Sequence, residues 1–133
     1  MKHNSSNKGK SINGNKFEKE FTELTGIVKM KKKDKPTFVN SHGLVQVVDF
    51  DFATEKNGEK IYVDVTTTFR SDRLKQKSYN ALMMKTKVGQ PCKFYMVVKT
   101  MVEGGKKKTP ILIEGIDGVI SIEEFTSYLK NAK

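Results

Sequence analysis

The chain has little cysteine, proline or tryptophan: among 133 residues there are one cysteine, three prolines and no tryptophan. The lone Cys92 excludes an internal disulfide framework and a zinc site built from several thiolates. No stretch approaches the roughly 20 consecutive apolar residues of a membrane-spanning helix. Residues 1–7 also lack the apolar core of a signal peptide. We therefore expect a cytoplasmic protein without a membrane partner.

Acidic residues are also scarce, with 15 Asp and Glu against 25 Lys and Arg, which gives a net charge of +10. Such a surplus favours a polyanionic partner, most often nucleic acid. An anionic membrane surface attracts the same composition, but no strongly amphipathic basic helix with a Trp, Phe and Leu face is evident. A generic basic surface that maintains solubility is the remaining alternative.

The length suits one domain with a real core. Residues 1–13 contain mainly Asn, Ser, Gly and Lys, a composition typical of a disordered basic arm. The single folded domain should therefore cover residues 14–133.

Helix caps and apolar spacing predict helices over residues 15–25, 72–86 and 121–130. Runs rich in β-forming residues predict strands at 27–30, 37–40, 93–102 and 111–114, and a hairpin over 44–66. This order predicts an α/β fold with a small mixed sheet between helices.

The hairpin carries the main functional signal. The Asn-Gly dipeptide at residues 57–58 is the strongest short hairpin signal in a sequence. A two-residue turn there puts Asp51 opposite Asp64, and Asp49 opposite Thr66, on one face of the sheet. Like charges at this distance destabilise a sheet, so we expect a metal ion to neutralise them. The alternative is a solvated, acidic sheet face.

Two such carboxylates, with a third from a neighbouring helix, offer the oxygen ligands that Mg²⁺ prefers. A metal held in this way can activate water and neutralise charge on a phosphodiester. The surplus of basic residues and the pair of aspartates therefore predict the same function, because the basic surface would attract the polyanion that the metal site would cleave.

Three segments carry a family resemblance: residues 14–20 (Gly-Asn-Lys-Phe-Glu-Lys-Glu), 48–51 (Val-Asp-Phe-Asp) and 62–66 (Tyr-Val-Asp-Val-Thr). In this order, within about residues 14–100, they resemble the PD-(D/E)XK, or restriction-endonuclease-like, nucleases. The pattern is closest to small resolvase-type members and restriction-enzyme catalytic domains. The first segment resembles the helix that often supplies a metal-binding glutamate. The other two resemble the segments that supply the family's two acidic positions.

The resemblance implies a restriction-endonuclease-like α-β-β-β-α-β core, with a central mixed sheet flanked by helices. It also implies a Mg²⁺-dependent deoxyribonuclease of restriction, nicking or structure-selective type, with Mn²⁺ able to substitute and a 5′-phosphate as product. The ligands would be Glu18, Asp51, Asp64 and the carbonyl of Val65. The first three would also be catalytic.

The family's lysine falls on Thr66, which cannot supply a positive charge. Some members take this group from the following helix, where Lys75, Gln76 and Lys77 are candidates. We assign the catalytic role to Lys77. Contacts to DNA would come from the basic segment after the strand and from the threonine itself, because Arg can clasp phosphate or read guanine. These residues are Arg70, Arg73, Lys75, Gln76 and Thr66.

The expected partner is double-stranded DNA, with either a homodimer or a partner subunit for cutting both strands. The alternative function is a catalytically inactive nucleic-acid-binding module on the same fold, which the loss of the lysine at Thr66 favours. A third reading is an unrelated basic α/β interaction protein.

Overall fold

The computed structural model describes residues 16–68, 70–89, 91–100, 102–103, 106–107 and 113–131. The arm predicted over residues 1–13 lies outside the described residues. Within the described ranges, none of the helices combines the length and apolar character that crossing a membrane requires.

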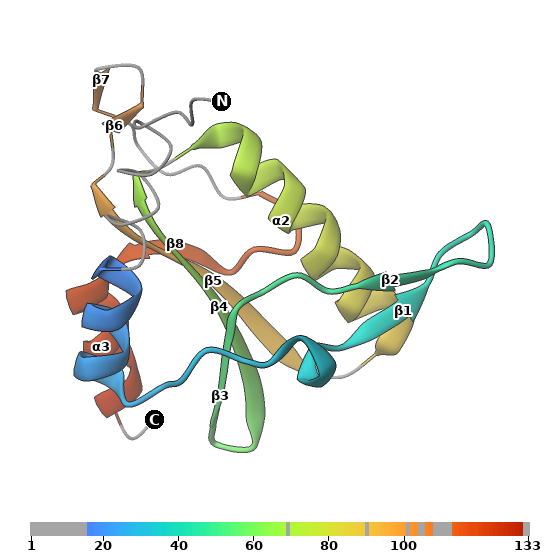
Figure 1. Ribbon diagram of the computed structural model, residues 1–133, viewed down its shortest axis with the longest axis horizontal. Coiled ribbons are helices and arrows are strands. Elements are labelled where there is room, and N and C mark those ends of the chain that lie inside the picture. The colour runs from blue at the N-terminus through green and yellow to red at the C-terminus, as the bar shows by residue number, and fades with distance from the viewer. Residues whose placement is uncertain are drawn as a thin grey trace, which may run out of the picture.

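The centre of the fold is a mixed sheet of four strands in the order β3-β4-β5-β8 (Figure 1). Strand β3 runs antiparallel to β4, whereas β5 runs parallel to β4 and β8 runs parallel to β5. The parallel crossover from β4 to β5 passes through helix α2. The prediction of an α/β fold with a small mixed sheet is therefore confirmed. The bounds are β3 Phe52–Lys56, β4 Glu59–Thr68, β5 Cys92–Thr100, β8 Gly118–Ser121 and α2 Ser71–Met83.

Helices cover both faces of this sheet (Figure 1). The helix over residues 16–25 and helix α3 (Ile122–Lys130) lie on one side, and α2 lies on the other. Helix α2 continues into a π-helical turn, η2 (Met84–Val88), which ends at Gly89 with a left-handed φ of 73°. The predicted capping box at Ser121 is present and begins α3. The three predicted helices therefore exist within a few residues of their expected bounds.

Strand β4 is buried on both faces, as strands with parallel neighbours commonly are. Ile61, Val63 and Val65 pack in the apolar cluster beneath the helix 16–25 and α3. Tyr62 belongs to the opposite cluster, under α2. Alternation along the strand directs Asp64 to this second side. The carboxylate of Asp64 is therefore buried on a face of the sheet where the neighbouring side chains are apolar.

The hairpin register is as predicted: Phe52 pairs with Val63, and the pairs continue to the turn. Asn57 and Gly58 both have positive φ, 55° and 80°, as a type I′ turn requires. The arms of the hairpin are shorter than predicted on one side, because β3 begins at Phe52.

The sheet pairs predicted for Asp51 with Asp64 and for Asp49 with Thr66 are both absent from the ladder. The ladder between β3 and β4 ends at Phe52, and the chain before it leaves the sheet. The carbonyl of Asp49 accepts a hydrogen bond from Lys77 of α2. The side chain of Asp49 binds Lys35, so contacts to lysines replace sheet pairing at this point.

Residues 44–51 also depart from the predicted hairpin. Strand β2 (Val45–Val47) pairs with β1 (Thr37–Val39) in a separate two-stranded sheet. A short 3-10 helix, η1 (Lys32–Asp34), precedes β1. Of the strand predicted at 27–30, only an isolated bridge from Lys29 to Phe52 is present. One bridge still aligns this segment with the edge of β3.

The strands after α2 also differ from the prediction. Strand β5 ends at Thr100, and the small pair β6 (Val102–Glu103) and β7 (Lys106–Lys107) follows. The strand predicted at 111–114 falls partly outside the described residues, and residues 113–114 are not in a strand. The last strand of the sheet is β8 instead, which is short and leads directly into α3.

Gly115 provides a test of how the segment before β8 packs on α2. Its φ is +87°, and a Cβ atom there would lie 2.9 Å from both the Leu82 nitrogen and the Ser78 carbonyl oxygen. We expect Gly115→Ala to lower the free energy of unfolding by roughly 2 to 4 kcal/mol. Gly43→Ala is the control, since Gly43 has a φ of +79° with nothing within 4 Å of the added Cβ. It should lose only about 1 kcal/mol. Urea denaturation measures both, and equal losses would contradict this packing.

Candidate functional site

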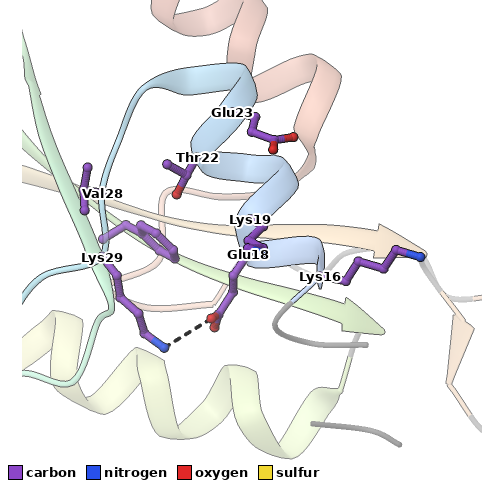
Figure 2. A pocket seen from close by; sticks show the side chains of 8 residues that line it. Lys16, Glu18, Lys19, Thr22, Glu23, Val28 and Lys29 are labelled. Atoms are coloured by element: carbon purple, nitrogen blue, oxygen red, sulfur yellow. Dashed lines mark hydrogen bonds and ion pairs between the residues drawn. The ribbon is translucent and has the colours of Figure 1, made fainter. Parts of the chain in front are cut away.

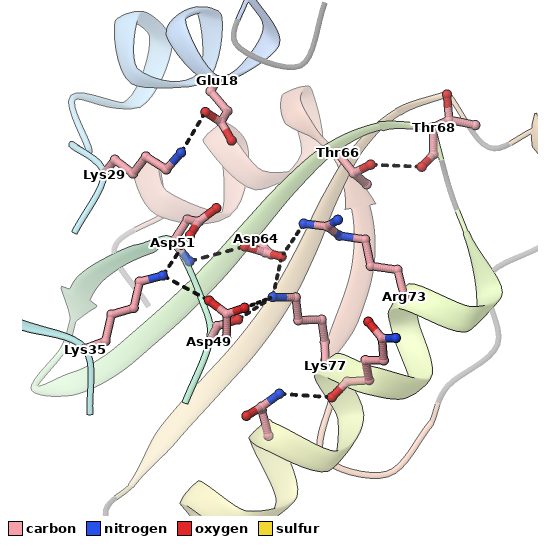
Figure 3. A network of polar contacts seen from close by, with 12 residues as sticks. Glu18, Lys29, Lys35, Asp49, Asp51, Asp64, Thr66, Thr68, Arg73 and Lys77 are labelled. Atoms are coloured by element: carbon pink, nitrogen blue, oxygen red, sulfur yellow. Dashed lines mark hydrogen bonds and ion pairs between the residues drawn. The ribbon is translucent and has the colours of Figure 1, made fainter. Parts of the chain in front are cut away.

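The site centres on the carboxylate of Asp64, whose residue exposes 0% of its surface (Figure 3). Its Oδ1 accepts a hydrogen bond from the Asp51 backbone N–H at 3.2 Å. Its Oδ2 lies 3.0 Å from Lys77 Nζ and 3.3 Å from Arg73 Nη2. Removal of a carboxylate from water is costly unless charges and hydrogen bonds replace the water. These three donors supply that replacement.

Arg73 and Lys77 both reach Asp64 from helix α2, because they are four residues apart and so share a helix face. Leu74, Ser78 and Ala81 of the same helix are buried against the sheet. Their burial fixes the rotation of α2 about its axis. The helix therefore presents the Lys77 side chain, only 7% exposed, to Asp64.

A third cationic side chain, that of Lys35, approaches from the loop after η1. Lys35 Nζ lies 3.0 Å from an oxygen of Asp49 and 3.0 Å from an oxygen of Asp51 (Figure 3). Lys77 also reaches Asp49 Oδ2 at 3.6 Å. Lys35 was not predicted as a site residue. The only signal for it in the sequence is its place in a lysine-rich loop.

The site therefore joins three aspartates to three basic side chains. Of the predicted residues, Asp51, Asp64, Lys77 and Arg73 come together. Lys75, Gln76 and Lys77 were the candidates for the cation missing at Thr66, with the role assigned to Lys77, and Lys77 is the one that contacts Asp64.

The environments shift the pKa values of two carboxyls in opposite directions. Burial raises the pKa of Asp64 above its ordinary value, and it outweighs the opposing charges of Lys77 and Arg73. The hydrogen bond from Lys35 lowers the pKa of Asp49. Asp49 therefore ionises at a lower pH than Asp64, although both carboxyls contact Lys77.

Glu18 lies at the margin of this network. Its carboxylate pairs with Lys29 at 3.2 Å, and both side chains line a cavity beside the helix 16–25 (Figure 2). The backbone of Lys29 forms an isolated β-bridge with Phe52, the residue after Asp51. Within the part of the chain that the structure describes, no three His, Cys, Asp or Glu side chains form a group that could hold a metal ion. The metal-binding role of Glu18 stays a prediction.

The other predicted DNA contacts lie outside the network. Arg70 pairs with Asp72 at 2.8 Å on the surface. Lys75 and Gln76 are exposed on α2. The Thr66 hydroxyl donates to the carbonyl of Thr68 at 3.0 Å. The Val65 side chain is buried on the opposite face of β4 from Asp64, and its carbonyl stays a predicted metal ligand.

No protein-family model matches the chain, and no curated protein matches it significantly. The chemistry of the site is therefore the basis for a functional proposal. That chemistry consists of three aspartate carboxylates paired with two lysines and an arginine.

Lys77 should be essential to stability because it neutralises a carboxylate that has no access to water. Lys77→Met should lower the free energy of unfolding by about 3 kcal/mol, since removal of one partner leaves a buried charge poorly compensated. Lys75→Met is the matched control two residues earlier on α2, where the side chain is exposed. It should change stability by less than about 0.5 kcal/mol. Similar losses in the two variants, measured by chemical denaturation, would contradict the pairing.

The order of the two carboxyl pKa values can be measured by ¹³C NMR. Asp64 should titrate above the ordinary value of 3.8, and Asp49 below it. By linkage, the stabilising contribution of Asp49 is present above its unfolded pKa and is lost as the pH falls through its folded pKa. Asp64 has the opposite sign: its contribution is greatest at low pH and is lost as the pH rises through its raised folded pKa. Titration of Asp49 above Asp64 would contradict this description.

Proposed function

We propose that the protein is a metal-dependent DNA endonuclease with a restriction-endonuclease-like core. One observation carries this proposal. The hairpin of β3 and β4 brings the backbone N–H of Asp51 to the carboxylate of Asp64, and Lys77 of the next helix, α2, forms an ion pair with the same carboxylate. The net charge of +10 adds attraction for DNA.

The order of elements supports the proposed core. A helix at 16–25 is followed by the edge bridge at Lys29, the hairpin of β3 and β4, helix α2 and the parallel strand β5. An α-β-β-β-α-β core has the same order, with the bridge at Lys29 in the position of its first strand. The ribbon of β1 and β2 is then an insertion between the first two strands.

The oxygen ligands at the site suit Mg²⁺, with Mn²⁺ as a substitute. Mg²⁺ is commonly held by one or two protein carboxylates, with water and substrate phosphate completing its shell. Asp51 and Asp64 would be these carboxylates, joined by the carbonyl of Val65 and by Glu18 once it releases Lys29. The bound ion would supply charge neutralisation at the phosphodiester and a lowered pKa for water.

Lys77 takes the role that Thr66 cannot perform. It comes from α2 rather than from β4, yet its ammonium group lies 3.0 Å from Asp64. A fixed ammonium group can orient a water molecule by hydrogen bonding and can stabilise negative charge as it develops. Asp64 therefore has a second task in the proposal, which is to hold this lysine in place.

Arg73 is suited to binding a phosphate group. One nitrogen of its guanidinium contacts Asp64, but Nε is buried and has no hydrogen-bond partner among the described residues. Nε has no access to solvent, whereas the Arg73 side chain as a whole is 40% exposed, so the exposed N–H groups of the guanidinium would bind a phosphate oxygen. Arg70, Lys75, Gln76 and Thr66 would extend the contact along the DNA backbone. Double-stranded DNA is the proposed substrate.

One observation favours a second candidate function, a catalytically inactive DNA-binding module. Asp49, Asp51 and Asp64 all form ion pairs with Lys35, Lys77 or Arg73. A protein that no longer used a metal could keep its carboxylates in this form. The two candidates differ in whether the aspartates are needed for cleavage.

Substitution of the aspartates tests the proposal. Asp51→Asn and Asp64→Asn should each reduce cleavage of supercoiled plasmid in Mg²⁺ by at least about 100-fold. DNA binding should stay equal or tighten, because each variant removes a negative charge. Glu123→Gln makes the same charge change on the exposed start of α3 and should cleave like the parent protein.

Cleavage by Asp64→Asn at the parent rate would contradict the nuclease proposal. DNA binding by the parent protein without cleavage, in Mg²⁺ and in Mn²⁺, would favour the inactive module. Circular dichroism of each variant controls for loss of the fold.

A further inference from the structure

The ribbon formed by β1 and β2 differs from the rest of the chain in charge. Residues 36–48 contain no Asp, Glu, Lys or Arg, although 30% of the whole chain is charged. The ribbon projects beside the C-terminal end of α2 (Figure 1). A segment so depleted of charge, in a protein of net charge +10, suggests a surface that another molecule covers.

The two faces of the ribbon have different surroundings. On the inner face, Phe38 is buried and its ring lies 6.1 Å from that of Tyr79 in α2. Gln46, its cross-strand partner, accepts a hydrogen bond from the Tyr79 hydroxyl at 3.3 Å. These contacts attach the ribbon to the helix that carries Lys77. The ribbon is therefore packed in place and presents its other face outward.

The outer face is aliphatic and exposed. Val39 pairs with Val45 across the ribbon, and their exposed fractions are 56% and 68%. Val47, opposite Thr37, and Leu44 at the turn extend the patch, with Leu44 63% exposed. Clustered apolar exposure of this kind marks interaction surfaces in soluble proteins. Within the described residues β1 and β2 pair only with each other, and neither strand carries a lysine that would discourage pairing of its free edge with another chain.

We propose that the outer face of this ribbon docks against the same face of a second copy of the chain. Two molecules of charge +10 repel each other where charged surfaces meet, and contact through residues 36–48 adds no charged side chain of the ribbon to that repulsion. An aliphatic face is also complementary to itself, as a two-fold symmetric interface requires. DNA is the less suitable occupant, because residues 36–48 offer no Lys or Arg to its phosphates.

The ribbon is joined at both ends to the candidate site. Lys35 stands immediately before the uncharged segment and Asp49 immediately after it, and the two side chains form an ion pair at 3.0 Å. A dimer through the ribbon would therefore restrain the two chain segments that carry these residues. The dimer itself does not depend on the proposed nuclease function.

Sedimentation velocity of the full chain tests the dimer. The parent protein should dimerise as its concentration rises to about 200 µM, a range in which an interface with a micromolar Kd is visible. Val45→Glu and Leu44→Glu should each raise the dimer Kd by at least about tenfold, because like charges would face each other across the contact. Both side chains are more than 60% exposed, so neither substitution disturbs the core.

Leu24→Glu is the matched control, since it makes the same charge change at an exposed apolar residue of the helix 16–25. It should leave the dimer Kd unchanged. A parent protein that stays monomeric throughout the concentration range would overturn the proposal, as would Val45→Glu and Leu44→Glu variants that dimerise like the parent. Fluorescence anisotropy with a DNA duplex tests whether DNA binds the ribbon instead. If the parent protein is monomeric and its DNA affinity falls in Val45→Glu but not in Leu24→Glu, the ribbon is a DNA-binding surface. None of these readouts uses cleavage.

Discussion

The rest of the site depends on one constraint, which is that the carboxylate of Asp64 has no access to water. Strand β4 is covered on both faces, so the charge must be balanced by protein groups rather than by solvent. Lys77 and Arg73 balance it from α2, and the backbone N–H of Asp51 completes the set. One buried charge thus couples the register of the hairpin to the rotation of α2.

The same balance of charges prepares the proposed chemistry. Lys35 holds Asp49 and Asp51, and Lys77 holds Asp64, so the carboxylates are neutralised before a metal ion arrives. In the proposal an incoming divalent cation displaces Lys35 from Asp51 and Arg73 from Asp64, while Lys77 stays beside Asp64. The lysine released from its carboxylates would add positive charge where DNA phosphates approach. Structural neutralisation and the proposed catalytic use of the site therefore involve the same side chains.

Local signals in the sequence were sufficient for part of this arrangement. The Asn-Gly turn acts over a few residues, so it fixed the register that brings Asp51 to Asp64. The contact of Asp49 with lysines could not be predicted, because it depends on where the ladder stops and on the approach of distant segments. The choice of Lys77 over Lys75 depends on the rotation of α2, which the packing of Leu74 and its neighbours determines. Strand β8 was missed because four residues, beginning with Gly118, carry too little β pattern.

Mn²⁺ binding followed by electron paramagnetic resonance tests the central claim, that Asp51 and Asp64 form a site for a divalent cation. The spectrum of free Mn²⁺ loses intensity when the ion binds, so a titration measures affinity without DNA or cleavage. We expect saturable binding by the parent protein and by Glu123→Gln. We also expect affinity at least about tenfold weaker in Asp51→Asn and Asp64→Asn, because each loses an anionic oxygen ligand. Equal Mn²⁺ affinity in all four proteins, or no binding by the parent, would contradict it.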